Sequence, residues 1–137
     1  MVDGEPSEVR SVASLKVCHP AQVALIPIFR RAVRDFAAEQ GADEDLCIDV
    51  ALAVSEAVTN AVKHSDARED EVVSLTATVA DDWLEIIVRD RGTGFGTAAS
   101  DGLGLGLSIV ARLSGQLTIS QEGSGTVVRM GFPLPRD

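Results

Sequence analysis

A stripe of polar side chains interrupts an otherwise apolar segment of the sequence. Its members are separated by seven, four and three residues: Asp49, Glu56, Asn60 and Lys63. At helical spacing they fall on one face, while almost every other residue from 46 to 62 is apolar or small, which predicts a helix buried over most of its girth. A carboxylate, an amide oxygen and an ammonium group together suit a metal ion and phosphate oxygens. A solvated helix face is the alternative explanation of the same pattern.

A carboxylate also ends a row of aliphatic residues further along the chain. The predicted strand from Trp83 to Asp90 carries an aliphatic residue at every second position, and the same period puts Asp90 on their face. A buried carboxylate needs a hydrogen-bond donor, which the exocyclic amine of an adenine would supply. The amides of its own loop are the competing donors. Thr126 shares a face with apolar residues of the last predicted strand and would present its hydroxyl to the same region.

Two clusters of glycines follow this strand. The first comes directly after Asp90 and the second directly before a short predicted helix: Gly92, Gly94 and Gly96, then Gly102, Gly104 and Gly106. Glycine lets the backbone approach a ligand closely, and the free amides at a helix N-terminus favour phosphate. Flexible turns would explain either cluster alone. Neither cluster is a P-loop, because no Gly-Lys-Ser/Thr is present, and neither belongs to a βαβ dinucleotide unit.

Hydrophobic periodicity predicts the elements that must position these residues. We expect helices at residues 20–40, 43–64 and 107–113, the second capped by Asp43, and strands at 8–17, 72–79, 83–90, 116–121 and 126–134. This order predicts an α+β fold, a two-layer α/β sandwich with a mixed, mostly antiparallel sheet and helices on one face. Residues 1–7 are expected to lie loosely, and residues 8–137 to form a single domain.

Composition and charge exclude several classes of protein. The 137 residues are 45% hydrophobic, as expected for one globular domain. Twelve basic against 21 acidic residues give a net charge of -9, which a nucleic-acid backbone would repel. Cys18 and Cys47 match no metal or redox spacing and are expected to be reduced thiols in the core. Because no segment has the pattern of a membrane span or a signal peptide, we expect a cytoplasmic protein without a membrane partner.

Taken in order, these features resemble the ATPase superfamily shared by gyrase, the Hsp90 chaperones, histidine kinases and MutL proteins. Residues 56–64 resemble its asparagine box, 90–94 its first glycine box, 102–110 the second, and Gly125-Thr126 the third. The resemblance implies ATP and Mg²⁺, with Asn60 as the Mg²⁺ ligand, Asp90 as the carboxylate that contacts adenine and Glu56 as the base or polariser. It implies nucleotide contacts for a further set of residues: Lys63, His64, Gly92, Gly94, Gly102, Gly104, Gly106 and Thr126. For His64, capping of the helix end is an equal alternative.

Within that superfamily the chain is most similar to the bacterial anti-sigma factor serine kinases. Residues 54–64, Val-Ser-Glu-Ala-Val-Thr-Asn-Ala-Val-Lys-His, carry this similarity, and the helix with Arg30, Arg31 and Arg34 also fits. That family binds a sigma factor and uses ATP to phosphorylate a small anti-anti-sigma protein on Ser or Thr. The resemblance therefore implies a serine/threonine kinase with these two partners, expected to form a homodimer.

The loop between the glycine boxes departs from this family. Residues 95–101 form a short stretch without Lys or Arg, where the switch kinases usually carry a longer segment. The short loop favours a non-catalytic, nucleotide-responsive binding module as an alternative. A stand-alone histidine-kinase catalytic domain is a second alternative, because residues 102–110 also resemble those enzymes. A gyrase-like or chaperone-like ATPase would need additional domains.

Overall fold

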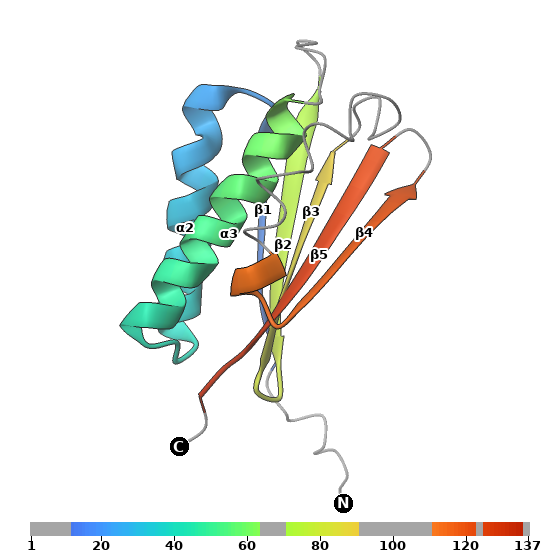
Figure 1. Cartoon of the computed structure of the whole chain (residues 1–137). Helices are drawn as coiled ribbons and strands as arrows, with labels where there is room; N and C mark the ends of the chain where they lie inside the picture. The colour runs from blue at the N-terminus through green and yellow to red at the C-terminus, as the bar shows by residue number, and fades with distance from the viewer. Residues whose placement is uncertain (1–11, 64–70, 91–110, 123–124, 136–137) are drawn as a thin grey trace, which may run out of the picture.

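The computed structural model describes residues 12–63, 71–90, 111–122 and 125–135, which form two layers (Figure 1). One layer is a five-stranded sheet, and helices α2 (Ile26–Glu39) and α3 (Glu44–Lys63) cover one of its faces. The strands are β1 (Ala13–Pro20), β2 (Val72–Ala80), β3 (Trp83–Asp90), β4 (Gln116–Glu122) and β5 (Gly125–Pro133). They lie in the order β1-β2-β3-β5-β4, and all of these pairings are antiparallel. The predicted α+β sandwich is confirmed, and its sheet is antiparallel throughout the described residues rather than mixed.

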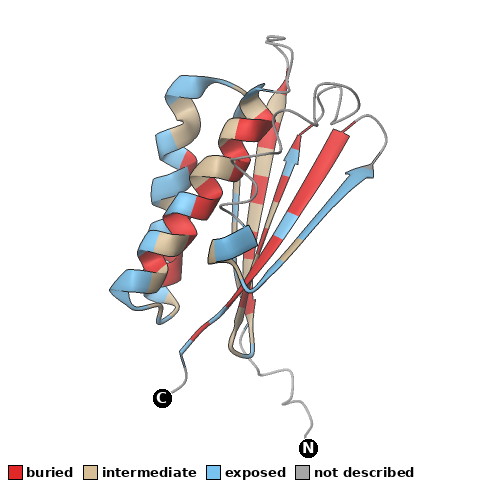
Figure 2. Cartoon of the chain, in the orientation of Figure 1, coloured by how far each residue is buried: buried red, intermediate tan, exposed pale blue. Residues whose placement is uncertain are grey.

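Alternation along the strands builds the core between the two layers. Residues at every second position of β2 and β3 are buried on the side of the helices, and those between them are partly or fully exposed (Figure 2). The largest fully buried side chains come from both layers: Phe29, Phe132, Leu75, Leu84, Ile86 and Met130. Each contributes about 1.5–3 kcal/mol relative to an exposed position. Neither helix in the described ranges is long and apolar enough to cross a membrane.

The chain enters α2 later than the sequence predicted. Strand β1 continues to Pro20, and an edge strand tolerates a proline because it has no second neighbour to which an N–H must be donated. A short 3₁₀ helix (Val23–Leu25) then precedes α2. Pro27 lies in the first turn of α2, where its missing N–H costs nothing, so it does not kink the helix. Asp43 accepts a hydrogen bond of 2.8 Å from the Leu46 N–H, which confirms the predicted cap of α3.

The prediction that α3 is buried around most of its circumference is wrong for one stripe of the helix. Ile48 and Leu52 are 48% and 42% exposed, whereas Val50, Val54 and Val58 are fully buried. A helix of a two-layer sandwich has the sheet on one side and its neighbour helix on another. Its remaining side faces solvent even when the residues there are aliphatic.

Other predictions fall partly outside the described residues. Residues 111–113 are helical, as expected for the end of the third predicted helix, while its earlier turns and the first residues of the predicted 8–17 strand are not described. Both cysteines are free thiols, and Cys47 is buried as expected. The prediction of a core thiol was wrong for Cys18, which is exposed on the edge strand β1. Burial raises the pKa of the Cys47 thiol, against an opposing effect of the Arg34 guanidinium nearby.

The outer face of the sheet is tightly packed at Trp83, the only tryptophan of the chain. Its indole lies against Gly131 of β5, where an added Cβ atom would overlap the ring. We therefore expect Gly131→Ala to lower the free energy of unfolding by about 1–3 kcal/mol in urea denaturation followed by circular dichroism. Ser120→Ala, at an exposed position of β4, should change it by less than about 0.5 kcal/mol. Equal stability of the two variants would contradict this packing.

Candidate functional site

The buried polar side chains of the described residues all lie at one end of the sandwich. They are Asn60, Glu71, Asp90 and Thr126. The arrangement of the elements explains their meeting: α3 ends at the end of the sandwich where β2 begins, β2 begins beside the end of β3, and β5 begins beside that same end (Figure 1). Burying polar groups is costly unless they find partners, so their concentration at one end indicates a site rather than ordinary core packing.

Asp90 and Thr126 form the sheet side of this site. They are direct neighbours across the β3–β5 ladder, on the face that the helices cover, and are 8% and 1% exposed. Cβ atoms of such directly opposed residues lie about 4.5–5.5 Å apart. The next pair in the register is Val88 and Val128, both buried. A carboxylate and a hydroxyl beside an aliphatic floor match the polar edge and the apolar face of a purine base.

The hydroxyl of Thr126 has unused hydrogen-bonding capacity. Its Oγ1 atom is buried and has no hydrogen-bond partner within the described part of the chain. An unsatisfied buried hydroxyl costs about 1–3 kcal/mol. A ligand that bonds to Thr126 Oγ1 would remove this cost, so the atom fits a binding site better than it fits a closed core.

The polar stripe of α3 forms the helix side. Asn60, one turn before the end of α3, is 4% exposed. Glu56 and Asp49, on the same stripe, are partly buried, and Lys63 in the last turn is exposed. Burial along the stripe is therefore uneven: it is greatest at Asn60 and is lost at Lys63. This unevenness argues against the alternative of a solvated face.

The polar side chains of this site suit a metal ion that is also bound by the phosphate oxygens of a ligand. Among the described residues, no group of three or more His, Cys, Asp or Glu side chains could form a protein-only metal site. The Asn60 amide oxygen is a hard donor, and the Glu56 carboxylate lies one turn earlier on the same stripe. Mg²⁺ commonly takes one or two protein ligands and fills its other positions with phosphate oxygens and water. Asn60 and its surroundings suit that mode of binding.

Sequence reasoning missed Glu71, which is only 7% exposed. It lies two residues before Val73, so the period of two that buries Val73 also places Glu71 on the inner face, and this signal could have identified it. The Glu71 carbonyl accepts a hydrogen bond of 3.0 Å from the Ala21 N–H and ties the two neighbouring strands together. Several predicted site residues lie outside the described ranges: His64, Gly92, Gly94, Gly102, Gly104 and Gly106.

Comparison with known proteins accounts for this arrangement. Residues 19–132 match the sequence pattern of the histidine kinase-like ATPase domain. The chain belongs to the histidine kinase-like ATPase domain family. The matched range contains Asn60, Asp90 and Thr126, and the superfamily predicted from the asparagine and glycine boxes is confirmed.

Within the histidine kinase-like ATPase family, the chain is similar to serine-protein kinases, as its sequence predicted. It is 30% identical to the serine-protein kinase RsbW of Staphylococcus epidermidis and 26% identical to that of Staphylococcus aureus strain MRSA252, with 79% of each chain covered. The structure of the RsbU and RsbW domains of Rv1364c from Mycobacterium tuberculosis has a TM-score of 0.72 and 28% identity, over 91% of this chain and 33% of that longer one. A chain of the SiaB-SiaC complex from Pseudomonas aeruginosa has the same fold, with a TM-score of 0.71, 16% identity and coverage of 91% and 92%.

Proposed function

We propose that this protein is an ATP-dependent protein serine/threonine kinase of the anti-sigma factor type. In this proposal it sequesters a sigma factor, phosphorylates an anti-anti-sigma protein, acts in the cytoplasm and forms a homodimer. The observation that carries the proposal is the convergence of Asn60, Asp90 and Thr126, all buried, at one end of the fold. The relatives named serine-protein kinases support the class of reaction.

The adenine would lie on the sheet side of the site. The Asp90 carboxylate would accept a hydrogen bond from the 6-amino group, and Thr126 Oγ1 would supply a second contact. Val88 and Val128 would lie beneath the base. This set selects adenine because a guanine carries a carbonyl oxygen at the same ring position, and a carboxylate cannot donate to it.

The triphosphate would lie against the end of α3. Asn60 would hold Mg²⁺, which neutralises phosphate charge when bound, and the exposed Lys63 ammonium would reach a phosphate oxygen. The predicted contacts of His64 and the box glycines belong to the same proposal. A local cation and backbone amides are needed because the net charge of the chain, -9, disfavours an anionic ligand.

Glu56 would take the proton from the attacking hydroxyl. The serine or threonine oxygen of the partner bonds to the γ-phosphorus, the bond from that phosphorus to the ADP oxygen breaks, and the hydroxyl proton passes to the Glu56 carboxylate. Glu56 is partly exposed and lies one turn before the buried Asn60, so it can face both the nucleotide and an incoming side chain.

The experiment compares wild type and Glu56→Gln with γ-labelled Mg-ATP and an extract of the protein's own cells. We expect acid-stable label on a small protein, formed about 100-fold or more slowly by Glu56→Gln, because a positioned base contributes at least that much. Calorimetry should show unchanged ATP affinity. Glu85→Gln is the matched control, since Glu85 faces away from the site and lies 3.4 Å from Arg129.

Other outcomes would reassign the chemistry. An acid-labile label would indicate transfer to histidine, as by a stand-alone histidine-kinase catalytic domain. No transfer by a preparation that binds ATP would leave the nucleotide-responsive binding module, which the short loop at residues 95–101 favours. In that case, partner affinity would depend on nucleotide and Glu56→Gln would not alter it.

A further inference from the structure

The polar part of the inner sheet face continues from Asp90 and Thr126 onto the edge strand β4. Gln121 is the direct partner of Thr126 in the β4–β5 register, as Asp90 is in the β3–β5 register. Directly opposed residues of antiparallel strands point to the same face, so the three side chains form a polar row across three neighbouring strands. Asp90 and Thr126 are buried and Gln121 is exposed. The row therefore runs from the interior of the sandwich to the open edge of the sheet.

An apolar row lies beside the polar row, two positions further along each strand. Its members oppose one another in the same way: Val88, Val128 and Ile119. Ile119 is 37% exposed although it lies on the inner face. Among the described residues, α2 packs mainly against β1 and α3 mainly against β3, so the inner face of β4 lies beyond both helices (Figure 1). A flat apolar ring placed on Val128 would extend over Ile119 and remove it from water, because neighbouring strands are only about 4.8 Å apart.

The polar row matches one edge of adenine position by position. The Asp90 carboxylate only accepts hydrogen bonds, which suits the 6-amino group. Thr126 Oγ1, which has no hydrogen-bond partner in the described part of the chain, can donate to the neighbouring N1. The next position along this edge of the base is C2, and the next residue along the row is Gln121. Its amide offers an acceptor oxygen at a position where adenine carries only a hydrogen atom.

We propose that Gln121 lies against C2 of the bound purine and accepts a hydrogen bond from a 2-amino group, so that the site prefers 2-amino-substituted adenine nucleotides to ATP. This inference rests on the proposed function, because it takes the place of the adenine from it. Guanine also carries a 2-amino group, so Gln121 favours GTP at C2 while Asp90 opposes it at the 6-oxo group. Within this row, selection of adenine over guanine therefore falls to Asp90.

The test compares ATP with 2,6-diaminopurine riboside triphosphate, each competing with a fluorescent nucleotide for the whole chain. We expect wild type to bind the diaminopurine nucleotide about 3- to 10-fold more tightly, the effect of one neutral hydrogen bond. Gln121→Leu should bind the two equally, and its ATP affinity should stay close to that of wild type. Gln121→Glu should widen the preference beyond about 10-fold, because a charged acceptor forms a stronger hydrogen bond. The ratio of the two affinities cancels the repulsion between the new carboxylate and the phosphates.

Two further variants are matched to Gln121→Leu. Gln116→Leu makes the same change at an exposed position on the opposite face of β4 and should keep the wild-type preference. In an Asp90→Asn background, GTP should bind more tightly than ITP, which differs from GTP only in lacking the 2-amino group. Adding Gln121→Leu to that background should remove the difference between GTP and ITP.

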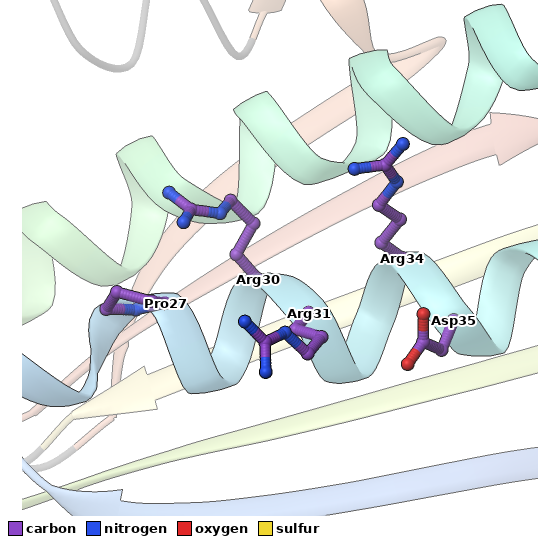
Figure 3. Close-up of a pocket in the computed structure, with 5 residues that line it drawn as sticks. All are labelled: Pro27, Arg30, Arg31, Arg34 and Asp35. Carbon is purple, nitrogen blue, oxygen red and sulfur yellow. The ribbon is translucent and has the colours of Figure 1, made fainter.

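A hollow on α2 offers a different place for the phosphates of a nucleotide. It has a volume of about 450 Å³ and is lined by Pro27, Arg30, Arg31, Arg34 and Asp35 (Figure 3). Arginines bind phosphate whatever base is attached to it, so a nucleotide held there would show no preference at C2. We expect Arg31→Gln to leave both affinities unchanged. An equal loss of both nucleotides in Arg31→Gln would assign nucleotide binding to the hollow and overturn the proposal.

The remaining outcomes separate this inference from the proposed function. Equal affinities of wild type for ATP and the diaminopurine nucleotide, or a preference that persists in Gln121→Leu, would overturn the role of Gln121. The proposed function would still stand if Mg²⁺ increased ATP affinity in the same preparation. A chain that binds neither nucleotide would refute both proposals.

Discussion

Replacing Asn60 with alanine is expected to lower the rate of phosphotransfer by about 100-fold or more, because the phosphates would lose the group that positions their cation. Asn60 is the buried member of the polar stripe of α3 and is 4% exposed. The truncation should also remove the gain in ATP affinity that Mg²⁺ provides. Calorimetric titration of ATP with Mg²⁺ and with a chelator measures that gain directly, independently of any protein substrate.

Thr59→Ala is the matched control for Asn60→Ala. Thr59 is the neighbouring residue of α3, is partly buried and projects about 100° away from Asn60 around the helix axis. Both substitutions shorten a polar side chain on the same turn, so a general loss of helix packing would affect both. A Mg²⁺-dependent gain that persists in Asn60→Ala would show that Asn60 does not hold the metal.

The second large effect is expected at Asp90, where Asp90→Asn should narrow the preference for ATP over GTP. The carboxylate only accepts hydrogen bonds, whereas an amide can also donate one to the 6-oxo group of guanine. Loss of a charged hydrogen bond costs about 1.5–3 kcal/mol, so ATP should bind about 10- to 100-fold more weakly. Competition between ATP and GTP for a fluorescent nucleotide measures both changes.

Two observations would count against this role of Asp90. One is an ATP-to-GTP preference that is the same in Asp90→Asn and wild type. The other is an equal loss of ATP affinity in Glu85→Gln, which makes the same carboxylate-to-amide change on the opposite face of β3. Because Asp90 and Thr126 are paired in register, Thr126→Val should weaken ATP in the same direction as Asp90→Asn.

The helix side of the site could be predicted from the sequence because its information is local. Glu56, Asn60 and Lys63 lie within three turns of one helix, and spacing alone puts them on one face. The period of two in β3 likewise predicted the inward position of Asp90, which is 8% exposed. Neither pattern could show that β3 and β5 place Asp90 directly opposite Thr126, because that register joins residues far apart in the chain.

The sequence was misleading where burial depends on neighbouring elements. Ile48 and Leu52 look like core residues, yet in the part of the chain that the structure describes no other layer covers that side of α3. Glu71 looks like part of an acidic connection, yet the pleat of β2 turns it inward. In both cases the residue type predicted the wrong degree of burial. The position of the neighbouring layer decides which side chains are exposed to solvent.

α3 carries Asn60 near one end and the exposed Ile48 and Leu52 nearer the other, and this has a thermodynamic consequence. A partner protein that contacted α3 could bind more tightly in one nucleotide state than in the other. Linkage requires the reverse effect to be equal in free energy, so that partner would alter the ratio of ATP to ADP affinities by the same factor. It could then select the nucleotide that remains bound without touching it.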